Sequence, residues 1–144
     1  MPQAHEARTR FENSQPILSV ADMTVSLRYY VDVLGFKNAP WGSEYFTSVN
    51  RDNPGIYLCQ GGQGPPGTWV WIGVEDVSSL YEEYKASGAK IRRPPENFPW
   101  ALEMQIEDPD GHVIRFGSEP RADRPFAQWR DCNGKIASPV VSWQ

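Results

Sequence analysis

Hydrophobic residues along this 144-residue chain follow two spacings, one typical of strands and one typical of helices. In residues 69–74 the side chains alternate, so Trp69 and Trp71 share one face of a predicted strand and aliphatic residues share the other. A helical spacing follows, made by Val77, Leu80, Tyr81 and Tyr84. Asp76 is a predicted N-cap and Gly88 a predicted helix stop, so this stretch predicts one strand followed by one helix.

The same plan occurs 54 positions earlier in the chain. Residues 16–20 form a predicted strand, Asp22 is a predicted N-cap and Gly35 is a predicted helix stop. Between them apolar residues recur at helical spacing, at Leu27, Tyr30, Val31 and Leu34. The two stretches therefore predict an internal repeat of a strand and a helix.

Further strand candidates follow each predicted helix and are separated by turn residues. They are residues 44–49 and 55–60 in the first half, and residues 89–94, 101–107 and 112–117 in the second. The last two are joined by the turn sequence Asp-Pro-Asp-Gly at 108–111, and the Gly- and Pro-rich segment 61–67 separates the halves. Each half is thus predicted to have the order βαβββ.

We expect an α+β fold in which two βαβββ modules, residues 14–60 and 68–119, form one domain. The modules are predicted to make a curved, partly open barrel-like sheet around a cavity, with the helices outside. Residues 1–13 read as a polar tail and residues 120–144 as a C-terminal extension. The extension has few helical features but several apolar residues, so it could pack on a dimer, cover a groove or be loosely attached; these residues are Phe126, Trp129, Val140, Val141 and Trp143.

Composition narrows the function classes. The formal net charge of −4 argues against a nucleic-acid partner, because readers of nucleic acid usually carry a basic face. No apolar run approaches the ~20 residues that span a bilayer, and the N-terminal residues lack the pattern of a signal peptide. Cys59 and Cys132 are far apart in sequence and are expected to be free thiols, so we expect a cytoplasmic protein.

Tryptophan is the unusual component, with six in the chain and four of them between residues 41 and 100. Trp69 and Trp71 either fill the core between sheets or line a cavity, and Trp100 either closes the mouth of the barrel or contacts a ligand. The sequence leaves both choices open.

Three stretches in this order resemble the vicinal oxygen chelate superfamily, which includes glyoxalase I, extradiol dioxygenases and bleomycin-resistance proteins. They are residues 16–36, 69–84 and 98–117. The resemblance implies a divalent metal held on the inner faces of the sheets. It places the ligand positions at Gln15, at Tyr57 or Cys59, at Trp69 and at Arg115.

Two of those positions carry side chains that do not ligate metals. Trp69 has no lone pair to give and Arg115 is a permanent cation, so no metal site of the family type and no cofactor are expected. The two histidines, His5 in the polar tail and His112 in a turn, are expected to face solvent and to play no part.

The local similarity is greatest to the bleomycin-resistance branch, which binds its drug between aromatic rings at a homodimer interface. The resemblance assigns ligand contacts to aromatic residues of both modules and to two charged residues: Trp41, Tyr45, Phe46, Trp69, Trp71, Trp100, Glu103 and Arg115. Glu103 is expected to pair either with a cationic ligand or with Arg115.

The leading hypothesis is therefore a homodimeric antibiotic-resistance-like protein that sequesters a planar or cationic small molecule without catalysis. Stacking between indoles gains on the order of 0.5–2 kcal/mol per contact, so several such walls suffice for micromolar binding. The first alternative is a metal-dependent enzyme of the glyoxalase or dioxygenase type with shifted ligands such as Gln15, Cys59 and Glu103. A regulatory module that accepts a metabolite or peptide is the second alternative.

Overall fold

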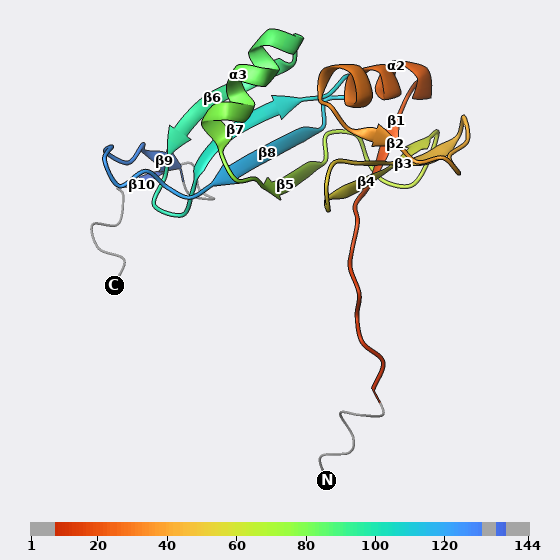
Figure 1. Cartoon of the computed structure of the whole chain (residues 1–144), viewed down its shortest axis with the longest axis horizontal. Helices are drawn as coiled ribbons and strands as arrows, with labels where there is room; N and C mark the ends of the chain where they lie inside the picture. The colour runs from red at the N-terminus through yellow and green to blue at the C-terminus, as the bar shows by residue number, and fades with distance from the viewer. Residues whose placement is uncertain (1–7, 131–134, 138–144) are drawn as a thin grey trace.

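The computed structural model describes residues 8–130 and 135–137 and arranges them as two sheets with helices on one side (Figure 1). The first module contains β1 (Ile17–Val20), α2 (Met23–Leu27), η1 (Arg28–Val33), β2 (Lys37–Asn38), β3 (Phe46–Asn50) and β4 (Gly55–Gln60). The second contains β5 (Trp69–Gly73), α3 (Val77–Ser87), β6 (Lys90–Asn97), β7 (Leu102–Glu107) and β8 (Val113–Ser118). A short pair, β9 (Trp129–Arg130) and β10 (Ile136–Ala137), follows.

The two sheets have the same topology, which confirms the predicted repeat of βαβββ modules. Their strand orders are β1-β4-β3-β2 and β5-β8-β7-β6, and in each the first strand pairs in parallel with the fourth. The α+β class is confirmed, and the sheets are open rather than closed into a barrel. The sequence pattern did not reveal β2, because a strand of two residues is too short to show an alternation.

The predicted helix caps are confirmed. The Asp22 carboxylate accepts from the backbone N–H of Val25 at 3.2 Å, and the Asp76 carboxylate accepts from Ser79 at 3.1 Å. The first helix changes to the wider π form over η1, where the N–H of Leu34 donates to the carbonyl of Tyr29. Helical spacing alone did not predict this change.

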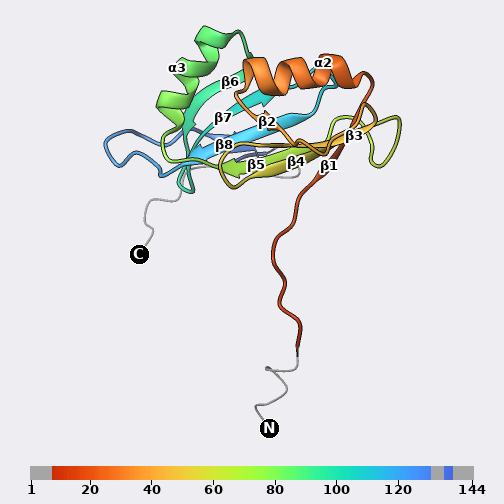
Figure 2. The ribbon, with the colours of Figure 1, turned by 45° about the vertical axis from the view of Figure 1, so that its right-hand side comes forward.

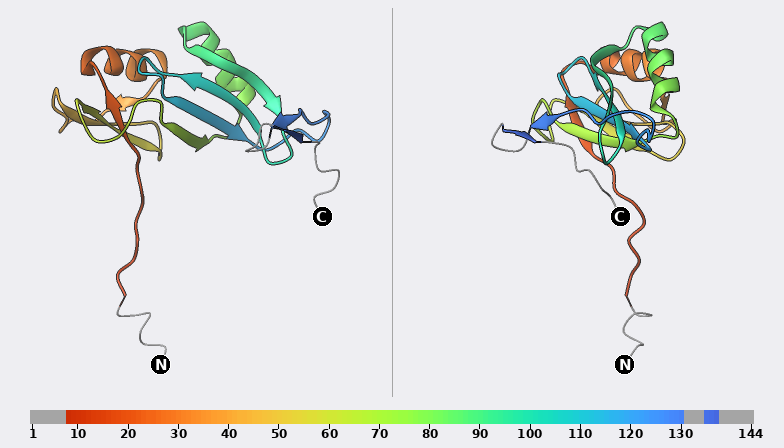
Figure 3. Two further views of the ribbon diagram at one scale, coloured as in Figure 1. Left: turned by 180° about the vertical axis from the view of Figure 1, so that it is seen from behind. Right: turned by 90° about the vertical axis from the view of Figure 1, so that its left-hand side faces the viewer.

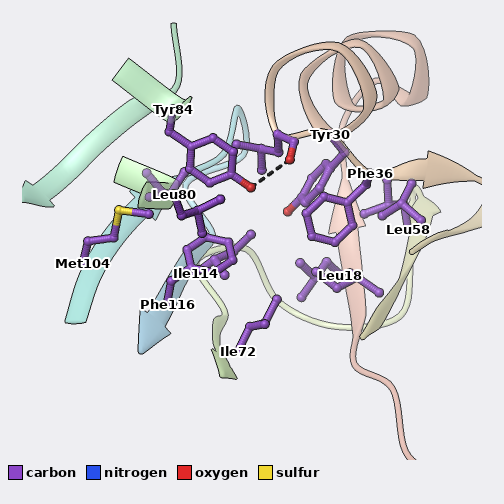
Figure 4. Close-up of a cluster of buried hydrophobic side chains, with 14 of the residues drawn as sticks. Leu18, Tyr30, Phe36, Leu58, Ile72, Leu80, Tyr84, Met104, Ile114 and Phe116 are labelled. Atoms are coloured by element: carbon purple, nitrogen blue, oxygen red, sulfur yellow. Dashed lines mark hydrogen bonds between the residues drawn. The ribbon is translucent and has the colours of Figure 1, made fainter. Parts of the chain in front are cut away.

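The core lies between the helices and the sheets and draws on both modules (Figure 4). Its fully buried members include Leu18, Tyr30 and Leu58 from the first module and Tyr84 and Ile114 from the second. The Tyr84 hydroxyl donates to the carbonyl of Leu34 at 2.8 Å, so a buried polar atom is satisfied across the modules. The modules therefore share one core, as expected for halves too small to fold alone.

The prediction for His112 was wrong, because this side chain is fully buried at the junction of the two sheets. Its Nδ1 accepts from the backbone N–H of Thr68 at 2.9 Å, and its Nε2 lies 2.6 Å from the carbonyl oxygen of Ser19. A carbonyl only accepts, so the proton is on Nε2 and the ring is neutral. His112 thus joins β1 of one module to the segment before β5 of the other.

The rest of the 108–112 turn also binds the first module. Tyr30 donates its hydroxyl to the Asp108 carboxylate at 2.8 Å, and Asp110 accepts from the backbone N–H of Ala21 at 3.0 Å. Burial raises the pKa of Asp108 above its usual value, and it also raises the pKa of Tyr30. The turn is a connector between modules as well as a link between strands.

The helices lie on one face of the sheets, as the rotated views show (Figures 2 and 3), and no helix of the described residues covers the other face. Residues 8–14 run away from the body at the start of the chain. His5, Cys132, Val140, Val141 and Trp143 lie outside the described residues. No helix in the described ranges is both long and apolar enough to cross a membrane.

Candidate ligand-binding face

The free face of the second sheet is built around Trp71, whose indole lies flat on two glycines. A Cβ added to Gly117 would come within 2.6 Å of Trp71 Cζ2, and one added to Gly73 would come within 3.1 Å of Cζ3. Gly73 and Gly117 are paired residues of neighbouring strands, so the floor beneath the ring is backbone. Trp71 is 54% exposed, so within the described residues it is not part of the core and one surface of its ring is open.

The buried Glu103 side chain connects three side chains of this face. Its carboxylate is 4% exposed and accepts from Trp71 Nε1 at 2.8 Å, from Trp100 Nε1 at 3.1 Å and from Arg115 Nη2 at 2.6 Å. The expected pairing of Glu103 with Arg115 is therefore confirmed, and its pairing with a cationic ligand stays a prediction. A buried carboxylate needs such donors, and here they fix the two indoles relative to each other.

Trp69 is 50% exposed and is also backed by the protein on one side. The guanidinium carbon of Arg92 lies 4.9 Å from its ring centroid, in the range of a cation–π contact. Arg92 also donates to Gln105, which holds the guanidinium over the sheet. Sequence reasoning did not identify Arg92 as a partner of Trp69, because the register shifts in β6 on either side of Arg93 were not predicted.

Trp100 completes a slot with Trp71. Its ring is 43% exposed and stacks on Phe98 with centroids 4.9 Å apart. A hollow of about 520 Å³ lies beside both indoles and is lined by Trp71, Gly73, Val74, Glu75, Trp100, Ala101, Gly117, Ser118 and Glu119. Glu75 and Glu119 were not among the predicted site residues, since both follow strand ends and carry no motif.

The first sheet carries a separate aromatic group on its free face. Phe46 and Tyr57 rings lie 5.2 Å apart between centroids, and Trp41 stacks on Phe46 at 6.4 Å. Tyr45 does not join this group: it lines another hollow, beside α2, with Met23. Tyr45 lies in the bend before β3, which begins at Phe46, so the strand does not hold its ring on the face that carries Phe46. No ring contact among the described residues joins this group to Trp69, Trp71 or Trp100.

The residues present do not fit a metal centre of the kind that the resemblance implies. Trp69 and Arg115 occupy two of its positions, and the Glu103 oxygens already accept from two indoles and a guanidinium. Gln15 accepts from Ser48 at 3.4 Å on the other sheet. Within residues 8–130 and 135–137, no cluster of three or more histidine, cysteine, aspartate or glutamate side chains is placed to hold an ion.

A family model described as the glyoxalase/bleomycin resistance protein/dioxygenase superfamily matches residues 13–116. The chain belongs to this superfamily. No curated protein sequence matches the chain. Among solved structures, this superfamily member is similar to the bleomycin-binding protein of Streptomyces verticillus complexed with copper(II)-bleomycin, with 22% identity and a TM-score of 0.67. That match covers 79% of this chain and 100% of the other.

Two further similar structures support the superfamily fold. TioX from Micromonospora sp. ML1 is 20% identical with a TM-score of 0.63, covering 74% of this chain and 99% of its own. A glyoxalase/bleomycin resistance protein/dioxygenase from Nocardioides is 17% identical with a TM-score of 0.63, covering 86% and 94%. At these identities the likeness establishes the fold.

Proposed function

We propose that this superfamily member is a small-molecule binder that sequesters a planar or cationic compound on its aromatic face without transforming it. The observation that carries the proposal is the three-donor environment of Glu103, which holds Trp71, Trp100 and Arg115 in place. This arrangement presents ring surfaces prepared for stacking, and each Glu103 oxygen already accepts a hydrogen bond, which competes with binding a metal or taking up a reacting proton. The alternative with Glu103 as a metal ligand is therefore disfavoured.

The active form in this proposal is a homodimer. Each chain carries two aromatic groups on the sheet faces away from the helices, one around Trp71 and one around Trp41, and no ring contact among the described residues joins them. In a twofold-symmetric dimer, the first sheet of one copy would face the second sheet of the other copy. The two aromatic groups would then enclose a ligand between them. The likeness to a bleomycin-binding protein supports this class of ligand.

The test is calorimetric titration of the purified protein with copper(II)-bleomycin and with N-methylquinolinium, a planar cation. We expect saturable binding of at least one probe, with a weakening of about 3–30-fold in Trp71→Ala, the range that one stacking contact supports. Tyr45→Ala is the matched control, because this exposed aromatic lies beside α2 and away from the slot. Sedimentation should give twice the mass of the chain.

Two results would contradict the proposal. One is the absence of saturable binding by either probe. The other is stoichiometric zinc, nickel, manganese or iron that remains bound to the purified protein, because a resident ion would favour the enzyme.

A further inference from the structure

The chain continues past the superfamily match, which ends at residue 116, and its next residues border the slot. Ser118 ends β8, and Glu119 follows it as an exposed residue in the lining of the hollow beside Trp71 and Trp100. The position of Glu119 therefore depends on how the segment after β8 is held. That segment belongs to this chain and is not part of the matched family region.

Asn97 holds the segment against the second sheet. This side chain is 6% exposed, and its Nδ2 donates to the carbonyls of Arg121 at 2.9 Å and Arg124 at 3.3 Å. Its Oδ1 accepts from the N–H of Arg121 at 2.7 Å, and its backbone carbonyl accepts from Ala127, also at 2.7 Å. A single buried amide thus satisfies both its donor and its acceptor groups on one loop, which fixes the loop beside the slot.

The charged side chains in the described lining of the slot are negative. Glu103 is neutralised by Arg115 at 2.6 Å, so it contributes little net charge to a ligand. Glu75 and Glu119 line the slot, and neither has an ion pair in the part of the chain that the structure describes. Among the residues that the structure describes, the slot lining includes no lysine, arginine or histidine.

Like the carboxylates in the slot lining, the two indoles favour a positively charged ligand. Both donate their N–H to the Glu103 carboxylate, and donation to an anion enriches the ring in π-electron density. A positive group placed between Trp71 and Trp100 would meet two such ring surfaces and the two unpaired carboxylates. Ring quadrupoles and carboxylates favour the same sign of ligand charge.

We propose that the segment after residue 116 is the specificity element of this protein: Asn97 positions it, and Glu119, together with Glu75, selects a positively charged group in the Trp71–Trp100 slot. The inference rests on the proposed function, since it concerns the same face. It assigns recognition of ligand charge to Glu119 and Glu75, in place of the Glu103 expected from the sequence. Asn97 is a positioning residue that acts through the loop.

The experiment compares two probes of similar shape, N-methylquinolinium as the cation and quinoline at pH 8 as the neutral molecule. Calorimetry at low salt gives the dissociation constant of each probe. The quantity compared between the full chain and each variant is the ratio of the quinoline dissociation constant to the N-methylquinolinium dissociation constant. We expect Glu119→Gln to weaken cation binding by about 3–10-fold and quinoline binding by less than about twofold. Asn97→Ser should lower the same ratio, because it loses the two bonds made by Nδ2.

Glu82→Gln is the control for loss of one negative charge, because Glu82 pairs with Lys85 on the exposed side of α3. It should leave the ratio unchanged. If both probes bind and Glu119→Gln leaves the ratio at its original value, the specificity element is refuted while the proposed binding function stands. If neither probe binds, the proposed function fails and the inference fails with it. Should Asn97→Ser unfold, the Glu119→Gln result still decides the role of the carboxylate.

Discussion

At the scale of single residues, the aromatic face depends on what lies beneath each ring as much as on the ring itself. Trp71 rests on glycine backbone, Trp69 lies against Arg92 and Trp100 lies against Phe98. Each ring has a protein surface on one side and is close to half exposed. Such support limits the rotamers that a free tryptophan would sample, which lowers the entropy lost on binding.

Gly117→Ala tests this support. The new Cβ would lie 2.6 Å from Trp71 Cζ2, so the indole must move and the bond from its Nε1 to Glu103 must stretch or break. We expect probe affinity to fall about tenfold or more, with a loss of folding free energy of about 1–3 kcal/mol. Calorimetric titration and urea unfolding measure the two effects.

Gly62→Ala provides the matched control, because a Cβ at Gly62 would meet no atom within 4 Å. It should change neither affinity nor stability. Unaltered probe binding by Gly117→Ala would show that the position of Trp71 is unimportant for the ligand.

At the scale of elements, the helix caps decide where each helix begins after its strand. Asp76 has an extended backbone, and its carboxylate accepts from Ser79 at the start of α3. Asp76→Ala should lower the free energy of unfolding by about 1 kcal/mol, since one backbone N–H loses its partner. Urea unfolding at neutral pH measures the change.

Asp76→Asn separates the cap from the charge. Asparagine keeps an acceptor oxygen at the same place, so this variant should lose only a few tenths of a kcal/mol. Equal losses in the alanine and asparagine variants would attribute the effect to the charge.

At the scale of the whole molecule, the 108–112 turn connects the two modules through hydrogen bonds to the first module. Burial raises the pKa of Asp108, and this outweighs the hydrogen bond from Tyr30, which lowers it. Because the folded-state pKa is higher than the unfolded one, the contribution of Asp108 to stability is present below its usual value of 3.8 and is lost as pH rises through the raised pKa. Asp108 therefore makes the chain relatively more stable in acid.

Asp108→Asn removes this contribution and keeps an oxygen for the backbone donors Asp110 and His112. The free energy of unfolding of the variant should therefore rise more steeply with pH than that of the natural chain, from about pH 4 upward. Urea unfolding at several pH values gives both slopes. The exposed Asp32→Asn is the control, and a variant slope equal to or shallower than the natural slope would refute the assignment.

The sequence by itself determined the repeat of a strand and a helix, the longer strands and the caps, but not the two-residue strand β2 or the π form of η1. These features follow from local patterns: the alternation at Trp69–Val74, the helical spacing at Val77–Tyr84, and an aspartate before each helix. It also offered Arg115 as one of two partners for Glu103, a pairing that the structure contains. The alternation, the helical spacing and the caps each lie within a few residues along the chain, where period and chemistry are visible.

Only the tertiary structure decided which side chains meet. It buried His112 between Ser19 and Thr68, which are 93 and 44 residues away, and it separated Tyr45 from Phe46. It placed Arg92 over Trp69 and Glu119 beside Trp71. These contacts arise from strand pairing, bulges and loops that bring distant segments together, and no local period in the sequence records such distances.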